Sequence, residues 1–203
     1  MYFLKTSSDN PPSDALLRLA CDHLRRFVVT DEDSPPGVEW PADIDYIRQC
    51  LVAAISHCDG PYSSIRRALL PQEWAVFLDR FPPVIELPLS PVTAVTYIKY
   101  VDSAGNWQTL DPSRYRLSGA YCWAPEISPA HGDAWPATLP VPDCVEVAFA
   151  AGYDEEKIPP AIVQAVLELM AHFYAERQPV VFGNPYQLPM SVKALLAPYK
   201  VFR

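Results

Sequence analysis

The sequence predicts an α+β fold, in which a small helical bundle carries an inserted antiparallel β-sheet lobe and ends in an extended C-terminal arm. Apolar residues recur at helical spacing in three segments, near 13–27, 41–58 and 159–177. A run of β-branched and aromatic residues over 92–101 precedes a turn and a short return strand. Residues 179–203 are rich in proline and apolar side chains but have little periodicity.

A length of 203 residues is typical of one compact unit. Within it we distinguish N-terminal helices over 1–70, a β-rich insertion over 71–153, a long helix over 154–178 that completes the bundle, and the arm over 179–203. The first helix is expected to begin at Ser13, a residue type that caps helix N-termini. The second is expected to open near Pro41 and to end before Gly60-Pro61, because proline is tolerated only in the first helical turn. The apolar stripes of these two helices contain Leu16, Leu17, Ala20, Leu24 and Phe27, and then Ile44, Ile47, Leu51, Ala54 and Cys58.

The β lobe is expected to contain strands near 92–101, 107–110 and 144–150, and the stretch that specifies its sheet runs from Phe81 to Tyr115-Arg116-Leu117. Gly105 supplies the positive φ that the tight turn at 102–106 needs. Residues 73–79 are apolar on both faces, so periodicity alone does not separate a strand from a buried helical turn; we interpret them as a strand. The approach to the sheet is interrupted by prolines, which exclude it from a central strand position: Pro82, Pro83, Pro88 and Pro91.

The third helix begins at Pro159-Pro160 and has so wide an apolar arc that it needs two packing partners. Tyr121 to Pro142 is expected to be irregular. The arm is expected to be extended, with one or two helical turns over 191–196.

Composition excludes several function classes. The net charge of −8 argues against broad phosphate binding, which needs a basic surface. The sequence has no run of 18 apolar residues and no recognisable signal peptide, so we expect neither membrane insertion nor export. Five cysteines at 21, 50, 58, 122 and 144 are then expected to be free thiols, which fits synthesis in the reducing bacterial cytoplasm.

Catalytic and ligand-binding motifs are weak. All seven glycines are isolated, so no Gly-rich phosphate loop exists, and neither Gly-x-Ser-x-Gly nor His-Glu-x-x-His occurs. Cys21-x-His23 and His57-Cys58 are the best metal candidates, but the spacing is not that of structural zinc, and we favour packing roles. Asp154-Glu155-Glu156 is interpreted as a solvated turn that favours the next helix. Three tryptophans suit core or interface packing better than base stacking: Trp107, Trp123 and Trp135.

Several short motifs occur in a characteristic order over nearly the whole chain. They are Gln72-x-Trp74, Leu78, Phe81-Pro82, Leu87-Pro88-x-x-Pro91-Val92, Val95, Tyr100, Asp102-x-x-Gly105, Tyr115-Arg116-Leu117, Trp135-Pro136, Phe149-x-x-Gly152-Tyr153, Pro159-x-x-Ile162, Tyr174-x-x-Arg177 and Leu195-Leu196-x-Pro198-Tyr199-Lys200-x-x-Arg203. In these motifs the chain resembles the head–tail connector (adaptor) proteins of long-tailed bacteriophages and of phage-derived gene transfer agents. Two departures are the long acidic loop over 31–41 and Ser56-His57-Cys58-Asp59-Gly60, where an acidic residue and a Thr-Gly pair often stand.

The resemblance implies a structural virion protein without catalysis or cofactor. Such proteins assemble into a ring, commonly twelve-fold, between the portal protein and the next neck or tail-completion protein, and DNA passes through the hole without specific binding. We expect acidic residues, such as 31–33 and 154–156, to let DNA slide past by repulsion. The alternative is a small cytoplasmic thiol- or metal-dependent hydrolase with an unrecognised site.

The arm is the segment most indicative of function, because an apolar tail of this kind marks an interaction site unless it folds back on its own domain. Aromatic and arginine residues are the usual anchors of interfaces. We therefore expect the arm to bind the portal protein or a neighbouring subunit through Leu195, Leu196, Tyr199, Phe202 and Arg203, an expectation tested by deleting residues 190–203.

Overall fold

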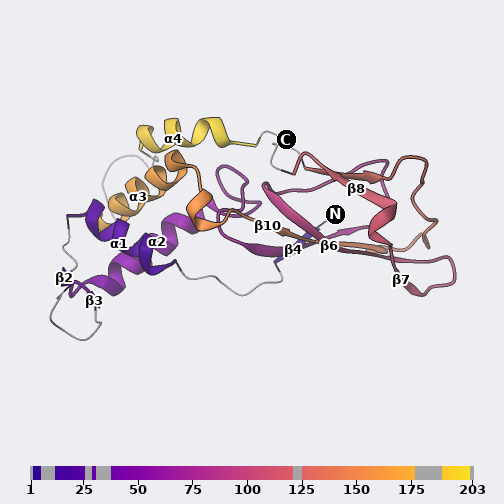
Figure 1. The fold of residues 1–203 in the computed structure, drawn as a ribbon, viewed down its shortest axis with the longest axis horizontal. Coiled ribbons are helices and arrows are strands. Elements are labelled where there is room, and N and C mark those ends of the chain that lie inside the picture. The colour runs from indigo at the N-terminus through magenta and orange to yellow at the C-terminus, as the bar shows by residue number, and fades with distance from the viewer. Residues whose placement is uncertain are drawn as a thin grey trace.

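A helical bundle and a β lobe lie side by side along the long axis of the protein, as Figure 1 shows. The computed structural model describes residues 2–5, 12–25, 29–30, 38–120, 125–176 and 189–201. This arrangement confirms the predicted α+β fold class. In the described part of the chain, no helix is both long enough and apolar enough to cross a membrane.

Four helices form the bundle: α1 (Asp14–His23), α2 (Ile44–Cys58), α3 (Pro160–Ala175) and α4 (Met190–Leu196). Ser13 caps α1 as predicted, because its Oγ accepts a hydrogen bond from the Leu16 backbone N–H at 3.1 Å. The helix ends at His23, earlier than expected, and α4 continues into the 3₁₀ turn η3 (Ala197–Tyr199).

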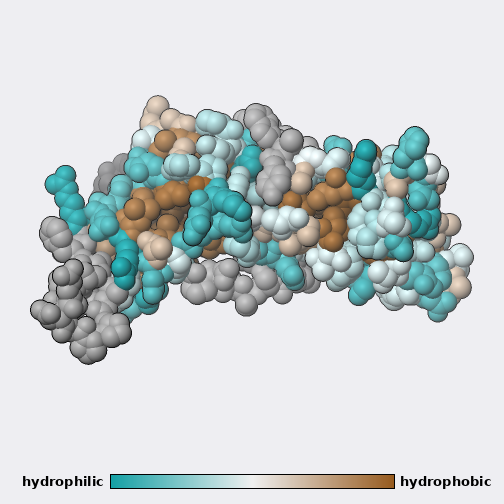
Figure 2. Space-filling view, in the orientation of Figure 1, coloured by the Kyte–Doolittle hydropathy of each residue, from teal (hydrophilic) through white to brown (hydrophobic). Residues whose placement is uncertain are grey.

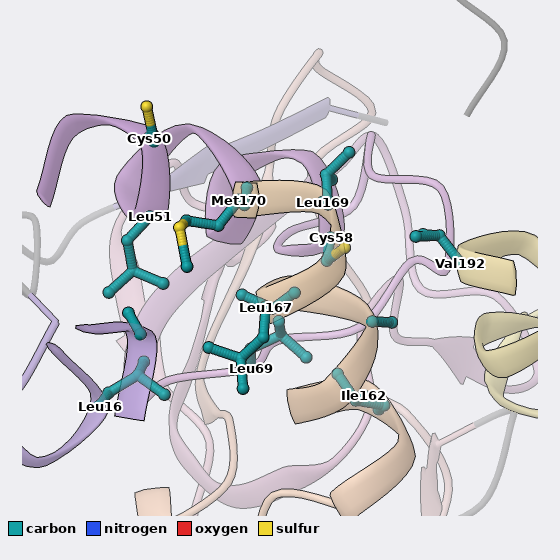
Figure 3. Packing of buried hydrophobic residues seen from close by; sticks show 14 of the residues in the cluster. Leu16, Cys50, Leu51, Cys58, Leu69, Ile162, Leu167, Leu169, Met170 and Val192 are labelled. Atoms are coloured by element: carbon teal, nitrogen blue, oxygen red, sulfur yellow. The ribbon is translucent and has the colours of Figure 1, made fainter. Parts of the chain in front are cut away.

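Helix α3 is the centre of the bundle. It packs against α1 and α2 on one side and against α4 on the other, so its wide apolar arc has the two partners that the sequence requires. Figure 3 shows side chains from all four helices gathered around it. The fully or nearly buried members include Leu17, Ile47, Leu51, Ile162, Leu169, Met170 and Val192.

A five-stranded antiparallel sheet forms most of the β lobe, in the order β1-β4-β10-β6-β7. Its strands are β1 (Tyr2–Lys5), β4 (Gln72–Leu78), β6 (Val92–Val101), β7 (Trp107–Thr109) and β10 (Val145–Ala151). The strands predicted near 73–79, 92–101, 107–110 and 144–150 are therefore confirmed. Strand β1 escaped prediction, since its few residues pair with β4 from a distant part of the chain.

A second, three-stranded sheet has the order β5-β9-β8, formed by β5 (Ile85–Glu86), β8 (Tyr115–Ser118) and β9 (Glu126–Pro129). The prediction that Tyr121 to Pro142 is irregular is wrong for β9, where fully buried Ile127 pairs with Ile85 and Leu117. As the prolines required, β5 is only a short edge strand. The long acidic loop is flanked by a small pair of strands, β2 (Val29–Thr30) and β3 (Val38–Glu39).

Several passes of the chain meet between the bundle and the β lobe, around Arg67, whose exposed fraction is 4%. Its Nε donates a hydrogen bond to the Tyr199 carbonyl at 2.8 Å. One terminal nitrogen of its guanidinium donates to Ser90 Oγ at 3.3 Å and to Tyr153 Oη at 3.0 Å. Arg67 therefore joins the entry to the β lobe, the exit from it and the C-terminal segment.

Gly152 occupies a crowded position at this junction. Its φ is +127°, and a Cβ placed there would lie 2.2 Å from the Leu70 carbonyl oxygen. Gly105, in the turn between β6 and β7, has φ +85°, and a Cβ at that residue would have nothing within 4 Å. An alanine at Gly105 would meet only the cost of a positive φ, whereas an alanine at Gly152 would meet that cost and a backbone clash as well.

We expect Gly152→Ala to lower the free energy of unfolding by about 3 kcal/mol or more, because the methyl group meets backbone that cannot yield. Gly105→Ala, the control, is expected to lose only about 1 kcal/mol. Urea unfolding followed by circular dichroism measures both. Equal losses in the two variants would contradict the packing described at Gly152.

Replacing Arg67 with methionine keeps much of the side chain's length but leaves the acceptors at the junction without their donor. We expect Arg67→Met to cost about 2–4 kcal/mol in stability and to accelerate amide hydrogen exchange over residues 190–201. Arg66→Met, at the exposed neighbouring position, is the matched control and is expected to change little. Unchanged exchange over 190–201 in Arg67→Met would show that the junction does not hold the C-terminal segment.

Candidate interaction surfaces

The C-terminal residues predicted to bind a partner have different environments. Leu196 is 4% exposed and belongs to the core of its own bundle, whereas Leu195 and Tyr199 are half-buried against that core. Phe202 and Arg203 lie outside the described residues. Residues 190–201 thus fold back on their own domain, one of the two alternatives for the arm, and the predicted helical turns over 191–196 are confirmed.

The outward side of α4 and η3 forms a surface that we call the α4 face. It consists of exposed Met190, Lys193, Ala194, Ala197, Pro198 and Lys200. Met190 is 84% exposed, which is unusual for a large apolar side chain. Residues 179–203 contain two lysines and one arginine but no acidic residue, so this surface is apolar and positively charged.

A second surface, which we call the bundle groove, lies between α1 and the segment formed by η2 (Glu155–Lys157) and the start of α3. Its volume is about 410 Å³. Leu16, Leu19, Ile158 and Val163 supply apolar lining, and Glu155 and Glu156 also line it. Leu19 is 43% exposed. Figure 2 shows hydrophobic surface over the helical half of the molecule, where α1 and α3 lie in Figure 1.

The 3₁₀ turn η2 places the acidic residues of this groove. Ser13 Oγ, at the start of α1, donates a hydrogen bond to Glu155 Oε1, and Lys157 forms an ion pair with Asp154 at 2.6 Å. Glu156 is exposed. The turn predicted at Asp154-Glu155-Glu156 is thus part of the bundle surface. It is hydrogen-bonded to the start of α1 and lies beside apolar side chains.

The cysteine environments do not favour thiol chemistry. Cys21, Cys50, Cys58 and Cys144 are free and buried, and Cys122 lies outside the described residues. Burial raises the pKa of the Cys58 thiol to about 11, and burial together with Asp22 and Asp43 also raises the pKa of Cys21. In the described ranges, no three His, Cys, Asp or Glu side chains are grouped so as to hold a metal ion.

A wide surface hollow of about 600 Å³ at the end of α2 contains residue types that hydrolases use, among them His57, Asp59 and Ser63. Asp59 Oδ1 instead accepts hydrogen bonds from the Leu69 N–H at 2.7 Å and from Gln72 Nε2 at 2.8 Å. His57 lacks a side-chain partner among the described residues, so nothing orients its ring as a general base. The hollow therefore has the residues but not the geometry of a hydrolytic site.

The tryptophans that were candidates for base stacking have different environments. The Trp135 ring stacks on Phe81 with centroids 4.8 Å apart, and its Nε1 donates to the Pro83 carbonyl at 3.3 Å. Trp107 is 55% exposed on the edge strand β7, and Trp123 lies outside the described residues. Trp135 thus packs within the lobe, as the sequence interpretation favours, and Trp107 remains on the surface.

Chains of known structure share this fold along its whole length. Neither a protein-family model nor a curated protein matches the sequence. A chain in the neck of an empty gene transfer agent (GTA) particle, computed with C6 symmetry, is 25% identical with a TM-score of 0.74. A chain in the virion of a native GTA particle is 25% identical with a TM-score of 0.73. Both matches cover 100% of this chain and 97% of the other.

The chain has the fold of a GTA neck protein. A third structure, the neck of a native GTA particle computed with C12 symmetry, supports the same fold with a TM-score of 0.67 at 24% identity. The resemblance inferred from the sequence motifs is therefore confirmed. These structural neighbours are chains in structures of GTA particles.

The buried thiols give a direct test against the hydrolase alternative. With a pKa of about 11, Cys58 has only about one thousandth of its thiol ionised at pH 8. In a Cys122→Ser background, we expect a chromogenic disulfide reagent to label the native protein slowly and the urea-unfolded protein rapidly. A thiol that reacts within seconds in the native state would reveal an activated cysteine and contradict this assignment.

Proposed function

We propose that this protein is a structural subunit of the neck of a phage or phage-like particle, where copies of it form a ring beneath the portal and join the capsid to the tail. The observation that carries the proposal is the match over the whole chain to chains in GTA particles, at TM-scores of 0.73 and 0.74. Since 97% of the matched chains is covered, both the bundle and the β lobe belong to the shared architecture.

The symmetry of the matching neck structures supports a ring. Two of the matching structures are necks computed with C6 or C12 symmetry, and a ring of identical subunits has closed symmetry of this type. We therefore propose a ring, with twelve copies as the first expectation. The site of function is then a virion neck.

DNA passage through this ring is supported by charge. A net charge of −8 disfavours tight contacts to phosphate, so DNA in the hole meets little attraction. Of the acidic segments considered from the sequence, 31–33 lies outside the described residues. Of the other segment, 154–156, Glu155 and Glu156 line the bundle groove.

The C-terminal segment is proposed to contact the portal protein or a neighbouring subunit. Leu195 and Tyr199 remain partly exposed, and Phe202 and Arg203 follow them, so these four supply the partner-facing side chains. Leu196 contributes instead by anchoring α4 in the core. The Arg67 hydrogen bond to the Tyr199 carbonyl holds this segment in place.

The ring is tested by co-expressing the chain with the portal protein encoded in the same genome. We expect a stable complex in which electron microscopy shows a ring of this chain on the portal. Purified portal and purified chain that fail to associate at micromolar concentrations, with both proteins folded, would overturn the proposed function.

The partner-binding segment is tested with Phe202→Ala/Arg203→Ala, which spares the buried residues of α4 that a deletion of 190–203 would remove. We expect portal affinity to fall tenfold or more, about 1.4 kcal/mol, because aromatic and arginine anchors dominate interface energies. Arg116→Ala, exposed on β8, is the control. Unchanged affinity in the double variant would remove these residues from the interface.

A further inference from the structure

The bundle groove and the α4 face have complementary chemistry. The groove has apolar lining from Leu16, Leu19 and Val163 and carries two carboxylates. The α4 face presents an 84% exposed methionine together with solvent-exposed lysines and contains no acid. Exposed apolar surface of this kind marks an interaction site, and opposite charges favour the pairing of two such surfaces.

A chain cannot fill its own groove with its own α4. Val192 and Leu196 hold α4 against the core, and the Val201 N–H donates to the Ile65 carbonyl at 3.1 Å just beyond η3. Figure 1 shows α4 along the upper side of the bundle, whereas the groove lies between α1 and η2–α3. The two surfaces are therefore available at the same time, on different sides of one molecule.

We propose that the α4 face of one copy docks in the bundle groove of the next copy. This inference deepens the proposed function, because it rests on the ring and names the contact that builds it. A contact between two different surfaces is head-to-tail, and repetition of such a contact produces a ring when the rotation closes. Each subunit uses both surfaces once.

The docking has an apolar part and an ionic part. Met190 is unbranched and flexible, so it adapts to the apolar lining of a groove whose volume, about 410 Å³, accepts several side chains. Lys193 and Lys200 stand opposite Glu155 and Glu156 of the neighbouring copy. The ionic part sets orientation and makes assembly weaken as salt concentration rises.

Charge reversal tests the pairing. We expect Glu156→Lys and Lys193→Glu each to raise the concentration needed for ring assembly on the portal at least tenfold. The double variant, Glu156→Lys/Lys193→Glu, restores the attraction with exchanged signs and is expected to recover most of the assembly. Arg116→Glu, on the β lobe, is the control for a change of net charge and is expected to assemble normally. Circular dichroism establishes that each variant is folded.

Cross-linking of the unmodified protein provides an independent measurement. Rings are assembled on the portal from a mixture of ¹⁴N- and ¹⁵N-labelled chains and treated with a carbodiimide, which joins a lysine amine directly to a carboxylate. We expect mixed-isotope links from Lys193 or Lys200 to Glu155 or Glu156. Assembled rings whose inter-copy links lie only elsewhere would overturn the inference.

The outcomes separate this inference from the proposed function. Rings that form normally from both single reversal variants overturn the α4–groove contact and leave the neck function standing. A reversal variant that binds the portal as single subunits without forming a ring supports the contact. Unmodified protein that forms no ring, alone or with the portal, overturns both proposals.

Discussion

The burial of one positive charge, on Arg67, organises the molecule. A guanidinium taken out of water is costly unless its donors find acceptors, and here the acceptors come from three separate segments. Ser90 precedes strand β6, Tyr153 follows strand β10, and Tyr199 belongs to the C-terminal 3₁₀ turn. The Arg67 guanidinium therefore has all of these acceptors only when the bundle, the β lobe and the C-terminal segment are correctly positioned relative to one another.

Neighbouring contacts extend the same constraint. Gly152 donates its N–H to the Pro91 carbonyl at 2.9 Å, and its approach to Leu70 leaves no space for a side chain. Asp59 joins the end of α2 to Leu69 and to the first residue of β4, Gln72. The junction is thus a network of backbone and side-chain hydrogen bonds, and it orients the helical half against the β half.

A hydrogen-bonded junction of this kind suits a protein whose proposed function is assembly. Surfaces that bind partners perform best when they are held on well-packed elements. The α4 face is held by the core residues behind it, and the bundle groove is held by Ser13 and the 3₁₀ turn η2. Side chains of the types that catalyse reactions have structural roles instead. The described cysteine thiols are buried, and the Asp59 carboxylate accepts hydrogen bonds that join α2 to the start of β4.

Local patterns in the sequence were sufficient to predict helices α1, α2, α3 and α4 and strands β4, β6, β7 and β10, because helical or β periodicity is visible in neighbouring residues. The tertiary structure alone decided the remainder. Strand β1 and strand β9 exist only through distant partners, β4 for one and Ile85 and Leu117 for the other. The same holds for Leu196, an expected partner contact that is buried, and for the bundle groove, whose lining comes from two segments far apart in the chain, 13–19 and 155–163. Periodicity determines which face of an element is apolar, but only long-range packing determines what covers that face and what remains exposed.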